Sequence, residues 1–282
     1  TLGLMIPPAI SLVIYGTVTG ASVGKLFIAI VIPGILLTIA YSIVSVFITV
    51  KRGYAKTASK EERVSAQEAG MILLGGIPAL LAPVIVLGGI YGGIMTPTEA
   101  AAVAAFYGLI VGVFLYREMD FKTVCSSCVA SCETSSIIIV LMAMATLFGN
   151  IMTIEDVPGT IARWMLSITE SKIIILLLIN VLLLIVGVFM EALAAIVILT
   201  PILLPVVTGV GVSPLHFGII MVVNLAIGFL TPPVGVNLFV ASGVAQAKIE
   251  KIAVAVLPMI ALMLIVLAII TYCPSVPLML VH

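Results

Sequence analysis

Charged side chains are scarce in this chain of 282 residues. Only 9% of the residues are Asp, Glu, Lys or Arg, whereas 63% are hydrophobic. A soluble domain carries about 25% charged residues, so the composition excludes a soluble globular fold. The formal net charge is zero, which leaves no basic excess for nucleic acid. The longest polar stretch, about 51–67, is too short to form a soluble domain. The composition therefore predicts an all-α polytopic membrane protein.

Signatures of enzymes are also missing. The sequence has no H-E-x-x-H, no G-x-x-x-x-G-K-[ST], and no G-x-S-x-G with a plausible catalytic partner. We therefore expect a chain that is not an enzyme and does not itself use ATP. An intramembrane enzyme or a purely structural subunit is the alternative of a different class. The acids available to such an enzyme are Glu99, Glu133 and Glu191, which lie far apart in the sequence.

Cysteine is limited to four residues, three of which form the pattern C-x2-C-x3-C over 125–132. This spacing occurs in metal sites. The flanking residues are small, however, as at a close contact between membrane helices, and no fourth ligand is nearby. The pattern favours helix packing, and we expect no metal site other than one for sodium.

The sequence does contain a repeated proline pattern. G-x-x-x-P-P occurs at 3–8 and at 228–233, with a constant offset of 225 residues, each time within an apolar stretch. Two consecutive prolines remove N–H donors and prevent a helix from continuing smoothly. In lipid, the freed carbonyls need protein or a water-filled cavity around them. Broken helices at matched positions predict inverted structural repeats and a secondary transporter with its sites near the middle of the membrane.

The apolar segments predict the order of the spans. The segment 191–207 contains Thr200-Pro201 and Pro205, and we expect it to be too short to span and to form a re-entrant hairpin over 187–211 with a broken tip. A broken helix over 214–247 follows, with halves at 215–227 and 236–247, and 9–20 is the matching half-helix of the first copy. Segments of about 20 apolar residues, long enough to span, are 24–50, 72–95, 98–116, 130–152, 172–190 and 252–273.

The offset also predicts the domain organisation. Residues 1–50 are the end of the first repeat, 51–66 a cytoplasmic loop with five basic residues, 67–123 linking or scaffold helices, and 124–282 the second repeat. Inverted repeats have opposite orientations in the membrane. Counting every segment as a crossing gives both repeats the same orientation, so either 124–152 or the amphipathic stretch 155–170 is expected not to span. The residues matching 189–227 would precede Thr1, and we expect the chain to be the C-terminal portion of a longer protein.

Oxygen ligands for an ion are predicted at the breaks. Gly228, Thr231 and Val234 are spaced by three around the second break, where main-chain carbonyls and one hydroxyl suit a hard cation such as sodium. An ordinary proline kink is the alternative. The counterparts of these residues at the offset of 225 are Gly3, Ile6 and Ala9.

Five further residues are candidates for the site. Glu191 is either a functional intramembrane acid that contacts substrate or a helix-start residue favoured by the helix dipole. Gly187 permits the close approach of an ion or of another helix. Asn237 contacts substrate or satisfies a freed carbonyl. Ser11 and Tyr15 follow the first break, where they contact substrate or, as we prefer, pack in the core.

Other polar residues have mainly structural interpretations. Thr96 or Thr98, followed by Glu99, predicts a helix N-cap, with a gating role as the alternative. Asn224 precedes the second break and is expected to brace the hairpin. His216 is interpreted as structural rather than as a proton relay.

The segments 3–16, 96–101 and 189–239, with their motifs G-L-M-I-P-P, T-P-T-E-A-A and G-F-L-T-P-P-V-G-V-N-L-F, resemble the large membrane subunit of tripartite ATP-independent periplasmic (TRAP) transporters. The resemblance covers essentially the whole chain. It implies an elevator-type, sodium-coupled importer of small organic anions, such as C4-dicarboxylates, sialic acid or other sugar acids. A periplasmic solute-binding protein and a small membrane subunit would be its partners, and the bacterial or archaeal inner membrane its location.

The resemblance also implies where sodium, the coupling ion, would bind; it implies no organic cofactor. Of the two sodium sites that the family implies, the first is expected to lack in this chain the half that a hairpin would supply. Alternatives within transport are an anion carrier that needs no binding protein and a sodium/proton exchanger of the same superfamily. The implied sodium sites fall on Gly187, Gly228, Thr231 and Val234, and on Gly3, Ile6 and Pro7.

Overall fold

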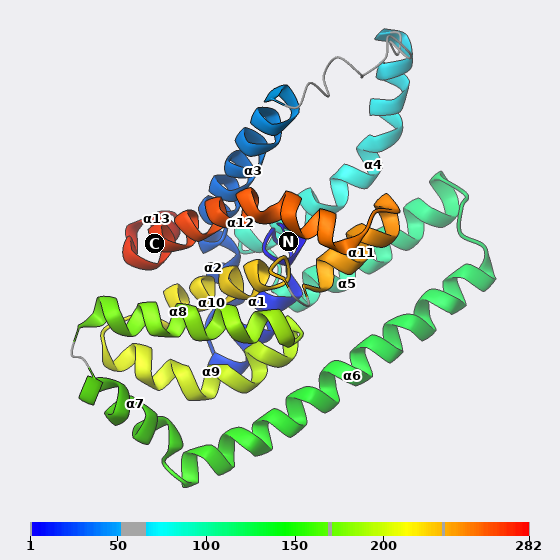
Figure 1. The fold of residues 1–282 in the computed structure, drawn as a ribbon. Coiled ribbons are helices and arrows are strands. Elements are labelled where there is room, and N and C mark those ends of the chain that lie inside the picture. The colour runs from blue at the N-terminus through cyan, green and yellow to red at the C-terminus, as the bar shows by residue number, and fades with distance from the viewer. Residues whose placement is uncertain (1, 52–65, 169–170, 233–234, 282) are drawn as a thin grey trace. The chain divides into compact units, whose positions relative to one another are not determined.

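The computed structural model describes residues 2–51, 66–168, 171–232 and 235–281, and every regular element in these ranges is a helix (Figure 1). The chain forms two compact units. One contains residues 1–44 and 138–282, and the other contains residues 45–137. The predicted cytoplasmic loop lies almost wholly outside the described residues.

Seven helices of the described ranges are long and apolar enough to cross a membrane. They include all six of the predicted spans, and the seventh is the segment 192–209, which the sequence predicted to be too short. The prediction of an all-α polytopic membrane protein is confirmed.

The smaller unit is built around a helical pair. Helix α4 (Ala66–Tyr91) packs against α5 (Pro97–Ile110), which continues as the π-helical turn η3 (Val111–Leu115). The Tyr107 hydroxyl donates a hydrogen bond of 2.8 Å to the Pro78 carbonyl and so joins the two helices.

The start of α5 confirms the predicted helix cap. The Thr96 hydroxyl accepts from the Glu99 amide at 3.3 Å, and the Glu99 carboxylate accepts from the Thr96 amide at 2.8 Å. This reciprocal pair satisfies two amides that the first helical turn leaves without partners.

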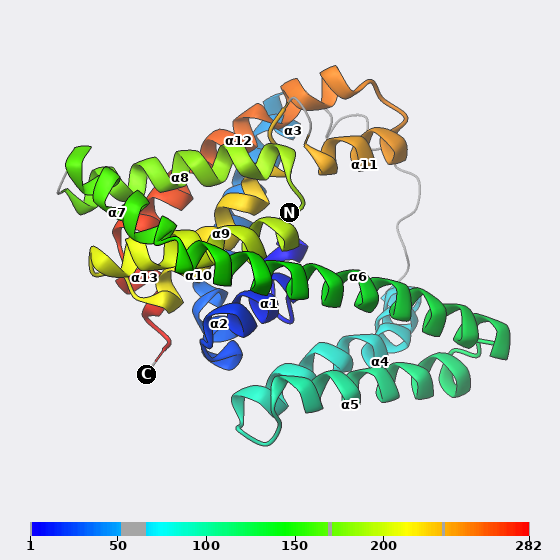
Figure 2. The same cartoon turned by 90° about the horizontal axis from the view of Figure 1, so that it is seen from below.

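The larger unit is centred on α10, which is buried at every residue from His216 to Gly228. A helix that is apolar on all sides belongs in a core, and α8, α9, α12, α1 and α2 all pack against it (Figures 1 and 2). The elements of this unit are η1 (Leu2–Leu4), α1 (Ile10–Thr19), α2 (Val23–Ala29), most of α3 (Val31–Lys51), the second half of α6 (Phe121–Ile154), α7 (Val157–Ile168), α8 (Lys172–Phe189), α9 (Ala192–Gly209), α10 (Pro214–Gly228), α11 (Val236–Ala245), α12 (Ile249–Tyr272) and α13 (Ser275–Leu278).

Helices α8 and α9 form a hairpin whose connection is Met190 and Glu191. The predicted break at Thr200-Pro201 is wrong, because α9 is one helix of 18 residues with Pro201 and Pro205 inside it. A proline within a helix removes one hydrogen bond and bends the helix, and this need not end it. At 18 residues the helix is about 27 Å long, close to the thickness of a bilayer core. The predicted turn after this helix is confirmed at Gly209–Gly211.

Both predicted helix interruptions are present. Helix α10 ends at Gly228 and α11 begins at Val236, and near the N-terminus η1 ends at Leu4 and α1 begins at Ile10. Pro7, Pro8 and Pro232 lie in these gaps, as expected from the N–H groups that they lack, and Pro233 lies outside the described residues.

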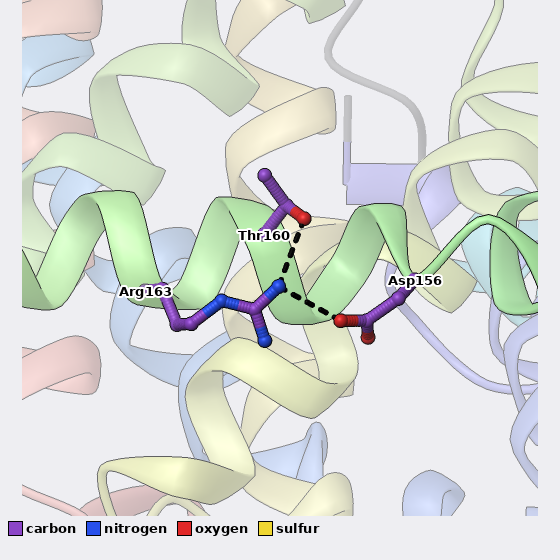
Figure 3. Close-up of polar contacts among 3 residues, drawn as sticks. All are labelled: Asp156, Thr160 and Arg163. Atoms are coloured by element: carbon purple, nitrogen blue, oxygen red, sulfur yellow. Dashed lines mark hydrogen bonds and ion pairs between the residues drawn. The ribbon is translucent and has the colours of Figure 1, made fainter.

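Helix α7 is an amphipathic helix of 12 residues, about 18 Å long, and therefore too short to span the membrane. Of the two segments in question, α6, with 34 residues, is long enough to cross; the orientation of the two repeats stays a prediction. Arg163 donates hydrogen bonds to Asp156 at 2.8 Å and to Thr160 at 3.0 Å along its exposed face (Figure 3). Exposed pairs of this kind contribute at most about 1 kcal/mol.

Candidate ion site at the second interrupted helix

The main chains of α8 and α10 meet at two glycines. A Cβ atom built on Gly228 would lie 2.5 Å from the Gly187 carbonyl carbon and 2.8 Å from its oxygen. A Cβ atom on Gly187 would lie 3.2 Å from Cα of Leu225. The glycine at 228 is therefore required by the close approach of the two backbones, and this approach brings the last turn of the hairpin's first helix to the end of α10.

The carbonyl of Gly187 is available for a ligand. It lies in the last turn of α8, where carbonyls have no amide partner within the helix. The Met190 amide donates to the Val186 carbonyl at 2.8 Å, and no main-chain amide of the described residues donates to Gly187. An unpaired oxygen thus lies beside the interruption of α10.

Thr231 supplies a second oxygen within the interruption. Its hydroxyl donates to the Ile227 carbonyl at 2.9 Å, and its amide donates to the Gly228 carbonyl at 2.9 Å. Because the hydroxyl proton is already used, the remaining lone pairs of the Thr231 oxygen can only accept. The Gly228 carbonyl likewise keeps a second lone pair.

The candidate ligands at this interruption are all oxygen atoms. The candidate ligands are carbonyls and one hydroxyl, which suit hard cations rather than transition metals. Within the described ranges no cluster of three or more His, Cys, Asp or Glu side chains is placed to hold a metal ion. Val234, the remaining predicted ligand of this site, lies outside the described residues. The residues present fit a sodium ion.

Glu191 caps the second helix of the hairpin. Its carboxylate accepts from the Leu193 amide at 2.9 Å and from the Ala194 amide at 3.1 Å. The helix-start interpretation of this residue is confirmed, and its negative charge lies one turn beyond Gly187 along the chain.

The first interruption is built differently. Gly3 lies in η1, and no atom of a packed neighbour lies within 4 Å of a Cβ atom built on it. The amide of Ile6 donates to the Leu2 carbonyl at 2.8 Å. The side chain of Ile6 is 48% exposed, whereas Pro7 is buried. No helix of the described residues meets Gly3 as α8 meets Gly228.

The other substrate candidates are engaged within the protein. The Ser11 hydroxyl donates to the Leu4 carbonyl at 2.7 Å, and the Tyr15 hydroxyl donates to the Pro214 carbonyl at 2.6 Å. Both side chains are buried, in agreement with the preferred interpretation of core packing. The main-chain amide of Asn237 donates to the Phe229 carbonyl at 3.1 Å across the interruption, and the role of its side chain stays a prediction.

A buried polar network lies behind the site and was only partly predicted. Asn224 donates to the Asn180 side-chain oxygen at 2.8 Å, and Asn180 donates to the Thr271 hydroxyl at 3.1 Å. Asn224 was expected to brace the hairpin predicted over 187–211, but its bond goes to Asn180, which precedes that segment in α8. Asn180 itself was missed, although it is the one polar residue in the apolar run 173–189. His216 is buried with its ring nitrogen 2.8 Å from the Ile270 carbonyl, which fits a structural role.

Apolar spans, two interrupted helices and a hairpin packed on one of them are features of secondary transporters of the membrane. Residues 1–276 match the family described as "Tripartite ATP-independent periplasmic transporter, DctM component". The chain belongs to this family. The family consists of transporter permeases rather than enzymes, and its members are multi-pass proteins of the bacterial inner membrane.

Curated relatives match the chain over nearly its whole length. It is 60% identical over 276 residues to "Isethionate TRAP transporter permease protein DctMQ" of Oleidesulfovibrio alaskensis. It is 43% identical over 278 residues to "C4-dicarboxylate TRAP transporter large permease protein DctM" of Pseudomonas aeruginosa, and 39% identical over 282 residues to "Sialic acid TRAP transporter large permease protein SiaM" of Vibrio cholerae. These matches cover 98–99% of this chain, but 43% of the first relative and 64% of the other two.

Proposed function

We propose that this chain is part of a permease that imports a small organic anion together with sodium. The three relatives are named for isethionate, C4-dicarboxylate and sialic acid, all of which are anions at neutral pH. A periplasmic solute-binding protein would deliver the anion, and a small membrane subunit would complete the permease, as the family membership of the chain suggests.

The observation that carries the sodium proposal is the contact between Gly187 and Gly228. It places an unpaired carbonyl of the hairpin beside an interrupted helix that offers further oxygen ligands. Such an arrangement can replace the hydration shell of a small cation without introducing a fixed charge into the membrane. Inward movement of sodium provides about 2.3 kcal/mol per charge per 100 mV, which can drive the accumulation of a solute.

The anion would be attracted by helix N-termini and by the bound sodium. Helix α1, which follows the first interruption, begins without a hydrogen bond from a capping side chain, so its first amides are available to an anion. In α11 the main-chain amides of Asn237 and Leu238 already donate to Phe229 and Gly235. The start of α9 is already capped by Glu191. No lysine or arginine of the described residues is buried, so sodium would supply much of the positive charge near the substrate.

The test is uptake by proteoliposomes that contain the complete permease with both membrane parts, supplied with its binding protein. Labelled isethionate, succinate and sialic acid are the probes. We expect one of them to accumulate when an inward sodium gradient is imposed, and not when choline replaces sodium. Accumulation without sodium would overturn the coupling. Uptake that is equally fast without the binding protein would instead support a carrier independent of that partner.

A further inference from the structure

Three helices of the larger unit are joined by one chain of buried polar side chains, two amides and one hydroxyl. Asn224 of α10 donates to Asn180 of α8, and Asn180 donates to Thr271 of α12, at 2.8 and 3.1 Å. All three side chains are at most 6% exposed. Each link is a specific contact between two helices, because a hydrogen bond fixes distance and direction more strictly than apolar packing does.

Stability alone does not account for the asparagine at position 224. Its side-chain nitrogen donates both to Asn180 and to the Ile220 carbonyl, at 2.8 Å in each case. Its side-chain oxygen is buried without a hydrogen-bond partner among the described residues. An unpaired buried acceptor lowers stability. A leucine of similar size would avoid this loss. We therefore attribute the asparagine at position 224 to the hydrogen bond by which its side-chain amide joins α10 to α8.

The hydrogen bond between the two asparagine side chains joins the same two helices that meet at the candidate ion site. Asn224 lies one turn before Gly228 on α10, and Asn180 lies two turns before Gly187 on α8. The segments between these residues are continuous helix. A shift of α8 against α10 at the asparagines is therefore transmitted to the glycines, where the backbones are already in contact.

We propose that the Asn180–Asn224 hydrogen bond is a positioning contact that fixes the register of α8 against α10. Through this register it places the Gly187 carbonyl beside the interruption of α10 and sets the affinity of the site for sodium. Neither asparagine touches the ion. This inference rests on the sodium site of the proposed function, and it adds the residues that tune that site from within the core.

Thr271 provides a matched control within the same network. It is as buried as Asn224 and it bonds the same Asn180. It belongs to α12, however, which contributes no candidate ion ligand. Thr271→Val removes a bond of Asn180 but leaves the bond between α8 and α10 in place.

The experiment measures equilibrium binding of ²²Na⁺ to the purified complete permease in nanodiscs, with choline as the balancing cation. The variants are N224L, T271V and the double variant N180L/N224L. We expect N224L to weaken sodium affinity about tenfold, and T271V to change it less than about twofold while lowering the unfolding temperature. The double variant removes both amides and leaves only the Thr271 hydroxyl without its donor. A threonine hydroxyl can donate to a carbonyl of its own helix instead, so the variant should fold, yet its sodium affinity should remain weak.

The readout separates positioning from stability. A merely structural role would reduce the number of sodium sites recovered without changing the affinity of those that remain. Wild-type affinity in N224L or in the double variant would overturn the inference and leave the proposed function intact, as would an equal loss of affinity in T271V. If the wild-type permease binds no ²²Na⁺ above the choline background, the proposed sodium site fails and the inference fails with it.

Discussion

Gly228 and Gly187 are in backbone contact, and a Cβ atom at position 228 would lie 2.6 Å from Cα of Gly187. The substitution Gly228→Ala should therefore force α8 and α10 apart. Overpacking of this kind costs about 1–3 kcal/mol of stability, and we expect it also to abolish the stimulation of uptake by sodium. Thermal unfolding of the purified permease and sodium-dependent uptake in proteoliposomes measure the two effects.

Gly243→Ala is the matched control for this substitution. Gly243 is also helical, but nothing lies within 4 Å of a Cβ atom built on it. This variant should unfold at the wild-type temperature or slightly above it, because alanine is the better helix former. Normal sodium stimulation in Gly228→Ala would contradict the assignment of the site.

Thr231→Val should raise the sodium concentration needed for half-maximal uptake by about tenfold. The substitution removes the hydroxyl oxygen that can accept a cation and also the hydrogen bond to the Ile227 carbonyl. Thr231→Ser keeps both and should behave like the wild type. A sodium titration of initial uptake rates distinguishes them, and equal half-saturation in the two variants would remove Thr231 from the ligand set.

Glu191→Ala should destabilise the hairpin by about 0.5–2 kcal/mol, as expected for the loss of an N-cap. The carboxylate now accepts from two amides at the start of α9. Glu191→Gln keeps an oxygen in place and should recover most of the stability. If both variants unfold at the wild-type temperature but lose substrate affinity, Glu191 acts on the substrate and not on the helix.

Tyr15→Phe should lower stability by about 1 kcal/mol, the usual net value of one hydrogen bond. Its hydroxyl is buried and donates to the Pro214 carbonyl, which ties α1 to the start of α10. The Michaelis constant for the transported anion should not change. A large rise in that constant with unchanged stability would instead place the hydroxyl in the substrate site.

The interruptions could be predicted because their cause is local. Pro7 and Pro232 each begin a double proline, and the missing amides act on the helix wherever it packs. The N-cap at Thr96 was predictable for the same reason, since its partner Glu99 is three residues away. Rules that act within one turn of helix transfer directly from sequence to structure.

The hairpin and the polar network depend on packing, and they were harder to predict. Pro201 looked like a break, but α9 continues past it within the core, where neighbouring helices hold both of its halves. The reversal at Met190–Glu191 has no glycine or proline to mark it. Asn180 and Thr271 are 91 residues apart in the sequence, and only the fold joins them.

Helix α10 has no open side along which it could slide. Its neighbours enclose it from His216 to Gly228, so whatever relocates the interruption after Gly228 must carry the surrounding helices as one block. Collective displacements of packed helices take on the order of microseconds to milliseconds. Under the proposed function, we expect this collective displacement, rather than the diffusion of an ion, to limit the rate of each transport cycle.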